Sequence, residues 1–211
     1  MDPDALEFDA VILAGGRSSR LGGVPKQQLT YDGATLLQRA LGAAGGAAAA
    51  VVVGPGSGAL PAGVLTCREE PPFAGPAAAI SAGLAALAAA SGTGPAATKA
   101  GWTLVLACDM PNVAPAVQCL LDALRHELQP GDGVVAVSMD GRRQPLVGLY
   151  STPALQRAAR DLASRGALIN GSVSALLASL DVRLVTVPAG STDDVDTWDD
   201  AAALGVAGRE P

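Results

Sequence analysis

Short apolar runs alternate along the chain with longer segments in which apolar residues recur at helical spacing. An unbroken apolar run is typical of a strand that is covered on both faces, as in parallel sheets. The runs that predict strands are 10–14, 47–53, 64–66, 102–107, 133–138 and 182–187. The segments that predict helices begin near residues 35, 77, 115, 152, 172 and 197, and those that begin at 115, 152 and 172 are predicted to end at 128, 164 and 180. This alternation predicts an α/β fold in which parallel strands are joined by right-handed crossovers.

Turn signals refine this pattern. Asp140-Gly141 is a strong hairpin signal, so the apolar run 146–150 is predicted to lie antiparallel to the strand before it. The glycine-containing segment 91–101 interrupts a series of strands and helices that continues after it. We interpret that segment as a surface insertion within a single domain that spans 1–211.

The strand predicted at 10–14 opens into a glycine-rich loop. Gly15 and Gly16 lack Cβ atoms, so the backbone can turn sharply there and bring its amide N–H groups close to an anion. The loop then adds cationic and hydroxyl side chains at Arg17, Ser18, Ser19, Arg20 and Lys26. These groups predict a site for a polyphosphate. The alternative is a glycine-rich turn that only joins a strand to a helix.

Two familiar phosphate-binding motifs do not fit this loop. The Walker pattern places a lysine directly after its last glycine, whereas Val24 and Pro25 separate the glycines from Lys26 here. The dinucleotide fingerprint requires Gly-x-Gly-x-x-Gly, whereas the first two glycines of this loop are adjacent. The sequence therefore disfavours a dinucleotide-dependent oxidoreductase.

A second chemical signal follows the strand predicted at 102–107. That strand ends in Cys108-Asp109-Met110-Pro111, and a carboxylate at the carboxyl end of a buried strand lies at the crevice where open α/β sheets bind ligands. We therefore expect Asp109 to face the same crevice as Gly15 and Lys26. The alternative is that Asp109 only caps the helix that follows. Cys108 is interpreted as a small core residue, not as a nucleophile.

Charge and cysteine content narrow the range of partners and compartments. The net charge of −6 argues against an extended surface for nucleic acid or for an anionic membrane. The 3 cysteines form no Cys-x-x-Cys pair, and an odd number does not suit a closed disulfide framework. No segment near residue 1 has the order of a signal peptide, and the apolar segment 77–90 is too short to span a bilayer. We expect a cytoplasmic protein.

The glycine loop resembles that of a known enzyme family. Leu13-Ala-Gly-Gly16, Arg20-Leu-Gly22 and Pro25-Lys26 match the signature of the MobA-like nucleotidyltransferases, and within them of the molybdenum cofactor guanylyltransferases. The resemblance covers almost the whole chain. It implies a three-layer Rossmann-like sandwich with a mostly parallel sheet and one antiparallel strand, the nucleotidyltransferase or GT-A-like fold. It also implies a nucleotide-binding half at 1–113, an acceptor-binding half at 114–205 and a frayed tail at 206–211.

The resemblance assigns a nucleotide site and catalytic residues. Lys26, Arg20 and Asp109 correspond to the catalytic positions. The implied nucleotide-binding residues are Leu13, Ala14, Gly15, Gly16, Ser18, Gly22, Lys26 and Gly75. In the family an acidic residue after the third strand recognises guanine, and the residue here is Glu69 or Glu70 where the family usually has Asp. A carboxylate can accept hydrogen bonds from the N1–H and N2–H₂ edge of guanine. The alternative is that both glutamates are solvated loop charges.

The resemblance also implies a magnesium site. Asp109 corresponds to the family's metal ligand, and Asp196, in the segment Asp194-Val195-Asp196-Thr197, could supply a second carboxylate opposite it. Carboxylates together with substrate phosphates are the usual ligands of Mg²⁺. The alternative for Asp196 is a place at a helix N-terminus that Thr197 caps, with Asp200 three residues further on.

A segment in the second half of the chain resembles the family's acceptor site. Arg142, Arg143 and Gln144 precede Pro145-Leu146, and guanidinium groups can bind a terminal phosphate with two parallel hydrogen bonds. The implied acceptor is a molybdopterin-type phosphate. The alternative is a pair of exposed arginines in a hairpin turn. The chain's only histidine, His126, is expected near a solvated helix end and is assigned no chemistry.

Together these features lead to a hypothesis for the function. The chain is expected to transfer GMP from GTP to the phosphate of molybdopterin, with Mg²⁺ as the cofactor and pyrophosphate as the leaving group. We expect a monomer that contacts other proteins of cofactor biosynthesis. Two alternatives stay open. One is a CTP-dependent cytidylyltransferase of the same fold, with a molybdopterin or a sugar or polyol phosphate as acceptor. Asp194-x-Asp196, Gln27-Gln28 and the absence of the family's Asp after the third strand favour it. The other is a non-catalytic nucleotide-binding module, which would need the glycine loop but not Lys26, Asp109 and Asp196 together.

Overall fold

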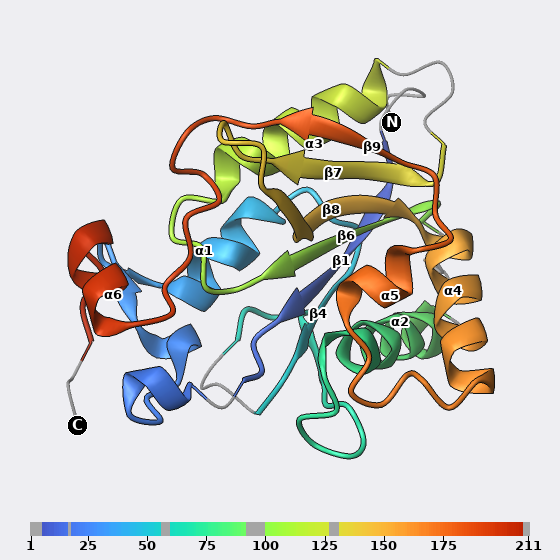
Figure 1. Cartoon of the computed structure of the whole chain (residues 1–211), viewed down its shortest axis with the longest axis horizontal. Helices are drawn as coiled ribbons and strands as arrows, with labels where there is room; N and C mark the ends of the chain where they lie inside the picture. The colour runs from blue at the N-terminus through green and yellow to red at the C-terminus, as the bar shows by residue number, and fades with distance from the viewer. Residues whose placement is uncertain (1–5, 17, 56–59, 92–99, 127–130, 209–211) are drawn as a thin grey trace.

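The structure is a computed structural model that describes residues 6–16, 18–55, 60–91, 100–126 and 131–208. Its main feature is a seven-stranded sheet with the strand order β5-β4-β1-β6-β8-β7-β9 (Figure 1). The strands are β1 (Phe8–Leu13), β4 (Ala50–Val53), β5 (Leu65–Cys67), β6 (Trp102–Ala107), β7 (Gly133–Val137), β8 (Arg143–Ser151) and β9 (Val182–Thr186). The predicted α/β fold class is confirmed.

The sheet is mostly parallel, with one strand reversed. β1 pairs in parallel with β4 and β6, β4 with β5, and β7 with β9. β8 is antiparallel to both of its neighbours, β6 and β7. The turn at Asp140-Gly141 lies between β7 and β8, and Gly141 has a φ of 86° there. The hairpin predicted from this dipeptide, and the antiparallel strand after it, are therefore confirmed.

Helices cover both faces of the sheet (Figure 1). On one face, α1 (Leu36–Ala43) and α3 (Ala114–Arg125) pack with strand residues such as Ile12 and Leu104. On the other face, α2 (Pro76–Ser91), α4 (Thr152–Ser164) and α5 (Val173–Leu177) pack with Val11 and Leu13. Because neighbouring residues of one strand point to opposite faces, β1 is apolar throughout most of its length and contributes to both cores. The predicted three-layer sandwich is confirmed.

A third, smaller core lies beside the sheet and joins the two ends of the chain. It connects the segment after β1, which includes the short helices η1 (Ser19–Leu21) and η2 (Lys26–Gln28) and the hairpin of β2 (Thr30–Tyr31) and β3 (Ala34–Thr35), to α6 (Trp198–Leu204). Its buried residues are Leu21, Leu29, Leu36, Val195, Ala201 and Val206. Figure 1 shows α6 next to the early part of the chain. We call this group the satellite core.

The tail expected at 206–211 is not frayed at its beginning. The Ala207 N–H donates to the Thr30 carbonyl at 2.7 Å, and the Thr30 N–H donates to the Ala207 carbonyl, also at 2.7 Å. Val206 is buried in the satellite core. The prediction of a frayed tail was therefore wrong for residues 206–208, because an apolar residue there packs on the segment after β1. Residues 209–211 lie outside the described part of the chain.

Several element boundaries differ from the sequence pattern. The strand expected at 47–53 begins at Ala50, and the helix expected at 172–180 covers only Val173–Leu177. The helix expected at 115–128 ends at Arg125, and both Leu128 and most of the insertion at 91–101 lie outside the described residues. Alanine and glycine are frequent in these segments, and small residues mark boundaries poorly. Within the described ranges, no helix is both long and apolar enough to cross a membrane.

The carboxyl ends of β1 and β4 approach each other very closely at Gly54. A Cβ atom on Gly54 would lie 2.8 Å from the Ala14 carbonyl carbon and 2.8 Å from the Gly15 nitrogen. The φ of Gly54 is 152°, which a residue with a side chain rarely adopts. Glycine at this position therefore lets the backbone after β4 support the glycine loop after β1.

We expect the substitution Gly54→Ala to lower the free energy of unfolding by about 1–3 kcal/mol, because the new Cβ would strain backbone that cannot move without displacing the glycine loop. Urea denaturation followed by far-UV circular dichroism measures the change. The matched control is Gly42→Ala in α1, where nothing lies within 4 Å of the added Cβ. There alanine should leave stability unchanged or raise it by up to about 1 kcal/mol. Equal unfolding midpoints for Gly54→Ala and the wild type would contradict the close approach.

Candidate active site

Three neighbouring strands end at the same edge of the sheet. Leu13 of β1 and Ala107 of β6 are register partners, so the chain leaves both strands at the same level. The Cys108 N–H donates to the Leu13 carbonyl at 3.1 Å, and the Ala14 N–H donates to the Val53 carbonyl at 2.8 Å. The glycine loop and the segment with Asp109 therefore leave the sheet side by side, at the edge where open α/β sheets bind ligands.

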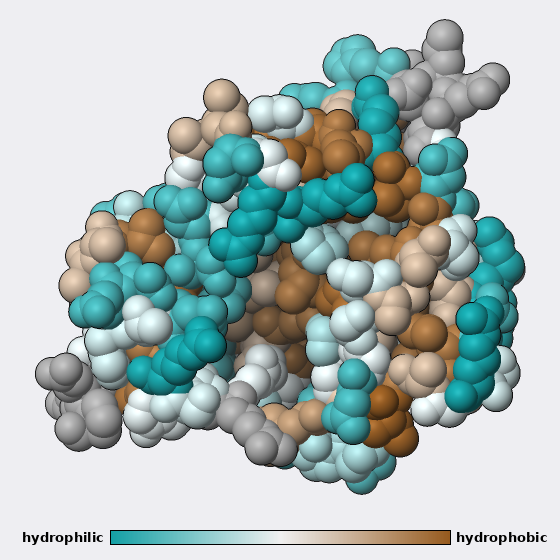
Figure 2. Space-filling view, viewed as in Figure 1, coloured by the Kyte–Doolittle hydropathy of each residue, from teal (hydrophilic) through white to brown (hydrophobic). Residues whose placement is uncertain are grey.

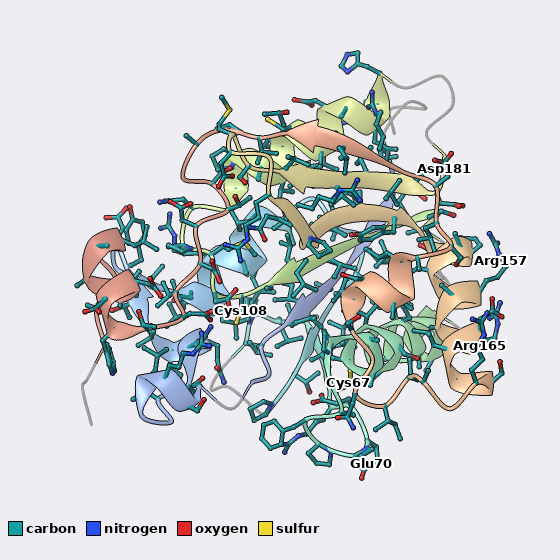
Figure 3. The ribbon with its side chains drawn as sticks, in the orientation of Figure 1. Cys67, Glu70, Cys108, Arg157, Arg165 and Asp181 are labelled. Atoms are coloured by element: carbon teal, nitrogen blue, oxygen red, sulfur yellow. The ribbon has the colours of Figure 1, made fainter. Side chains whose placement is uncertain are left out.

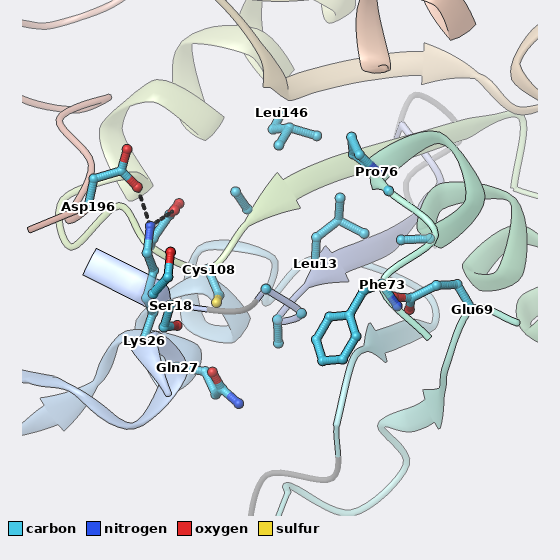
Figure 4. Close-up of a pocket in the computed structure, with 18 of the residues that line it drawn as sticks. Leu13, Ser18, Lys26, Gln27, Glu69, Phe73, Pro76, Cys108, Leu146 and Asp196 are labelled. Atoms are coloured by element: carbon cyan, nitrogen blue, oxygen red, sulfur yellow. Dashed lines mark hydrogen bonds and ion pairs between the residues drawn. The ribbon is translucent and has the colours of Figure 1, made fainter. Parts of the chain in front are cut away.

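A cavity of about 510 Å³ opens at this edge. Figure 2 shows it as a hollow with a hydrophobic floor and hydrophilic side chains along part of its rim. Figure 4 shows Lys26 and Asp196 at one end, Glu69 and Phe73 at the other, and Leu13 between them. Of the predicted site residues, the cavity lining contains Leu13, Ala14, Gly15, Gly16, Ser18, Arg20, Lys26, Glu69, Gly75, Asp109 and Asp196.

Other predicted residues lie outside the lining. Gly22 has a φ of 64° and caps η1, so its position shapes the loop without facing the cavity. Glu70 is exposed, and Figure 3 shows it at the outer edge of its loop. The predicted acceptor residues Arg142, Arg143 and Gln144 also lie outside the lining, to which their segment contributes only Leu146. Arg17 lies outside the described residues.

Charged side chains meet at the end of the cavity near the glycine loop. The Lys26 ammonium forms an ion pair with Asp109, whose Oδ2 lies 3.1 Å from Nζ, and a second ion pair with Oδ1 of Asp196. Arg20 approaches the other oxygen of Asp196 at 3.6 Å. The Lys26 and Asp109 side chains are only 19% and 22% exposed. The expectation that Asp109 faces the same crevice as Gly15 and Lys26 is confirmed.

Burial and attraction act in opposite directions on Lys26. Burial by itself lowers the pKa of the Lys26 ammonium, but Asp109 and Asp196 together outweigh this effect and raise the pKa above its ordinary value. The amine is therefore cationic at neutral pH. It is suited to bind phosphate oxygens and not to accept a proton.

Asp194 is a third carboxylate at this place, and the predicted metal ligands did not include it. Oxygen atoms of Asp109, Asp194 and Asp196 lie within 4.8 Å of one another. Burial, followed by repulsion from Asp109 and Asp196, raises the pKa of Asp194. The signal in the sequence was the spacing of two, because in extended backbone residues i and i+2 point the same way. Val195 between them is buried, and its N–H donates to the Asp109 carbonyl at 3.0 Å.

The proposed helix cap and the carboxylate cluster coexist. Thr197 and Asp200 form a capping box at the start of α6, in which the Asp200 N–H donates to the Thr197 hydroxyl at 3.1 Å. The Thr197 N–H donates to Oδ2 of Asp200 at 2.8 Å. These bonds supply partners for N–H groups at the N-terminus of the helix. They do not use the Asp196 carboxylate, which forms ion pairs with Lys26 and Arg20. The two interpretations of this segment are therefore compatible.

Glu69 and Glu70 have different environments. Glu69 is 7% exposed, and its Oε1 accepts a hydrogen bond from the Phe73 N–H at 2.9 Å. Its Oε2 is buried and has no hydrogen-bond partner among the described residues. A buried acceptor of this kind costs about 1–3 kcal/mol unless a donor reaches it. Of the two glutamates, only Glu69 lines the cavity.

Two reactive residue types do not supply a nucleophile here. Cys108 lines the cavity, but burial and then the Asp109 carboxylate raise the pKa of its thiol far above neutrality. His126 is exposed at the end of α3, where its Nδ1 bonds to the Asp122 carbonyl at 2.7 Å. Both agree with the roles assigned from the sequence. The cavity lining also contains residues that were not among the predicted site residues, namely Gln27, Phe73, Pro76, Ala79, Ala107, Cys108 and Leu146. Ser19, which also lines the cavity, was expected only as a hydroxyl group of the glycine loop.

Comparisons with known proteins agree with this geometry. Residues 10–184 match the family described as the MobA-like NTP transferase domain. A probable molybdenum cofactor guanylyltransferase of Opitutus terrae is 32% identical over 94% of this chain and 93% of its own length. One of Mycobacterium avium is 30% identical over 97% and 98%.

A solved structure agrees as well. The crystal structure of Rv0371c from Mycobacterium tuberculosis superimposes with a TM-score of 0.66 and 26% identity, over 94% of this chain and 97% of that one. One assignment follows from these matches together with the sheet order, the glycine loop and the ion pair between Lys26 and Asp109. The chain belongs to the MobA-like NTP transferase family and is a nucleotidyltransferase.

Proposed function

We propose that this protein transfers GMP from GTP to the terminal phosphate of a molybdopterin-type acceptor and releases pyrophosphate. One observation supports this most strongly: a single cavity is lined by the Lys26–Asp109–Asp196 cluster at one end and at the other by Glu69, whose Oε2 has no partner among the described residues. The first end suits the phosphates of a nucleotide and the second suits its base. The names of the relatives from Opitutus terrae and Mycobacterium avium indicate the same reaction.

The charges of the cluster favour a triphosphate that arrives with a cation. Lys26 and Arg20 contribute two positive charges, whereas Asp109, Asp194 and Asp196 contribute three negative ones. A triphosphate would be repelled by the excess negative charge unless a cation compensated it. Asp109 and Asp196 would hold Mg²⁺, with Asp194 as a further ligand, since hard carboxylate oxygens suit this ion. When bound, Mg²⁺ would neutralise phosphate oxygens in the transition state.

The chain's own cations have a separate role. If Asp109 and Asp196 coordinated a cation, the electrostatic attraction of these carboxylates for Lys26 and Arg20 would weaken. The two basic side chains could then interact with the β- and γ-phosphates. Both would stabilise the charge that develops on the departing pyrophosphate. Gly15 and Gly16 would bring backbone N–H groups to the same phosphates without obstruction by a Cβ. The protein thus acts by positioning and by neutralising charge.

The reaction needs no protein nucleophile. A terminal phosphate is mostly dianionic near neutral pH, so the acceptor can attack the α-phosphorus of GTP directly and in line. The bond from the α-phosphorus to the bridging oxygen breaks, and pyrophosphate carries the electron pair away. This agrees with the buried, protonated thiol of Cys108 in the cavity wall.

Glu69 favours guanine over cytosine. Guanine offers two adjacent donors, N1–H and N2–H₂, that a carboxylate can accept together. Cytosine presents acceptors at N3 and O2 and a single amino donor, so it cannot make the same pair of bonds. The carboxylate cluster offers another explanation for the spacing Asp194-x-Asp196, which favoured a cytidylyltransferase in the sequence.

Isothermal titration with GTP and CTP tests the base and the cation together. We expect GTP to bind in the presence of Mg²⁺, CTP to bind at least about 10-fold more weakly, and EDTA to weaken GTP binding by a similar or larger factor. Incubation with GTP and molybdopterin, followed by mass detection of the product, identifies the reaction. Tight Mg²⁺-dependent binding of CTP without a response to GTP would favour the cytidylyltransferase instead.

The substitution Asp109→Asn should reduce pyrophosphate release by about 100-fold or more, because it removes a carboxylate that compensates the cation at the reacting phosphates. A coupled pyrophosphate assay measures the rate across a Mg²⁺ titration. The matched control is Asp122→Asn on α3, an exposed residue that pairs with Arg125 at 3.0 Å, and it should react at the wild-type rate. Undiminished turnover in Asp109→Asn would contradict the metal-binding role of Asp109, whereas a wild type that binds GTP without releasing pyrophosphate would support a non-catalytic nucleotide-binding module.

The substitution Glu69→Gln should weaken GTP binding by about 10- to 100-fold, since hydrogen bonds to a charged acceptor are worth about 1.5–3 kcal/mol. ITP lacks the 2-amino group, so the wild type should prefer GTP over ITP and the variant should lose most of that preference. Glu70→Gln is the control, because Glu70 is exposed and lies outside the cavity lining. The assignment of Glu69 fails should Glu70→Gln have the larger effect.

A further inference from the structure

The loop that carries Glu69 also holds a strained aromatic residue at the cavity. Phe73 has a φ of 63°, in the left-handed region that bulky residues rarely adopt. Its side chain nevertheless stays 43% exposed and lines the cavity. Backbone strain of this kind persists where the surroundings hold it, and it clusters at ligand-binding positions. Because a ring this exposed contributes little apolar burial to the core, its position at the cavity indicates a role in binding a ligand.

Contacts from several sides hold Phe73 in place. Its N–H donates to Oε1 of Glu69 at 2.9 Å. The guanidinium carbon of Arg68 lies 5.3 Å from the centre of the Phe73 ring, within the range of a cation–π contact. The next residue, Ala74, is buried, and its carbonyl accepts a hydrogen bond from the Asn170 N–H at 2.6 Å. The ring is therefore presented from a fixed loop.

The neighbouring carboxylate indicates the kind of ligand. Glu69 lines the same part of the cavity, and its Oε2 has no partner among the described residues, so a turn of this carboxylate toward the cavity would let it accept a donor from a ligand. Figure 4 shows the Phe73 ring projecting toward the cavity from the same loop as Glu69. A planar heterocycle suits this pair of residues, because the carboxylate can accept hydrogen bonds from its edge and the aromatic ring can stack on its face.

We propose that Phe73 is the base-stacking residue of the nucleotide site, where its ring packs against the face of the guanine whose edge Glu69 reads. This inference rests on the proposed function. Stacking tolerates any base because every base has a π-face, whereas hydrogen bonds to an edge discriminate between bases. Phe73 therefore supplies affinity, and Glu69 supplies selectivity. Arg68 holds the ring and adds positive charge to its surroundings.

Two substitutions separate stacking from simple apolar contact. Phe73→Leu keeps an apolar side chain without a π-face, and it should raise the Kd for GTP about 10-fold in the presence of Mg²⁺. It should raise the Kd for ITP by the same factor, so that selectivity is unchanged. Phe73→Tyr retains the ring and should bind like the wild type. Leu184→Ala on β9 is the control, because Leu184 is also 43% exposed but lies outside the cavity lining.

A third substitution separates binding from folding. Phe73→Gly removes both the ring and the backbone strain, so it should unfold at an equal or higher urea concentration than the wild type while it binds GTP more weakly. An unchanged Kd in Phe73→Leu, or a loss confined to GTP with ITP unaffected, would overturn the stacking role and leave the proposed function intact. A wild type that binds CTP but not GTP would refute the proposed function, yet weaker CTP binding by Phe73→Leu would still support stacking.

Discussion

Apolar packing in the satellite core is the constraint on which the charged site depends. Lys26 and Asp196 are 170 positions apart along the chain, and ion pairs that remain partly exposed contribute little to stability by themselves. Their attraction could not hold two distant segments together. Burial of Leu21 and Leu29 against Val195 does so, because apolar area removed from water stabilises contacts without requiring charge. The charges are thus brought together by hydrophobic residues that lie outside the cavity lining.

The sheet supplies the second part of the framework. β1 and β6 end at paired residues, and Gly54 allows the backbone after β4 to approach the glycine loop. A rigid edge therefore supports one end of the cavity, whereas the other end is formed by the loop that contains Glu69 and Phe73. The separation matches the shape of a nucleotide, whose phosphates and base need different partners. The reversed strand β8 brings Leu146 to the same cavity from the second half of the chain.

What the sequence could predict depended on how local each signal was. Gly15, Gly16 and Lys26 belong to one contiguous loop, and Asp109 directly follows a buried strand, so the sequence alone was enough to assign both to the same crevice. Asp194 and Phe73 were not assigned in this way. For Asp194 the sequence offered only its spacing of two from Asp196, and the satellite core is what folds this distant segment back to Asp109. Phe73 lies in an irregular loop, where no periodicity reveals which side chains face a cavity.

The cavity contains two features that lower the stability of the fold, and a bound ligand would offset both. First, oxygen atoms of three carboxylates lie within 4.8 Å of one another, and only Lys26 and Arg20 compensate their charge among the residues described. Second, a buried Glu69 oxygen lacks a donor among the same residues. Each arrangement would be selected against in a site with no ligand, since simpler residues would stabilise the fold more. Under the proposed function, a cation would compensate the first and a base with paired N–H donors would compensate the second. The two costs are therefore those that the proposed ligand would offset, with a metal-bound polyphosphate at one end and a donor-bearing base at the other.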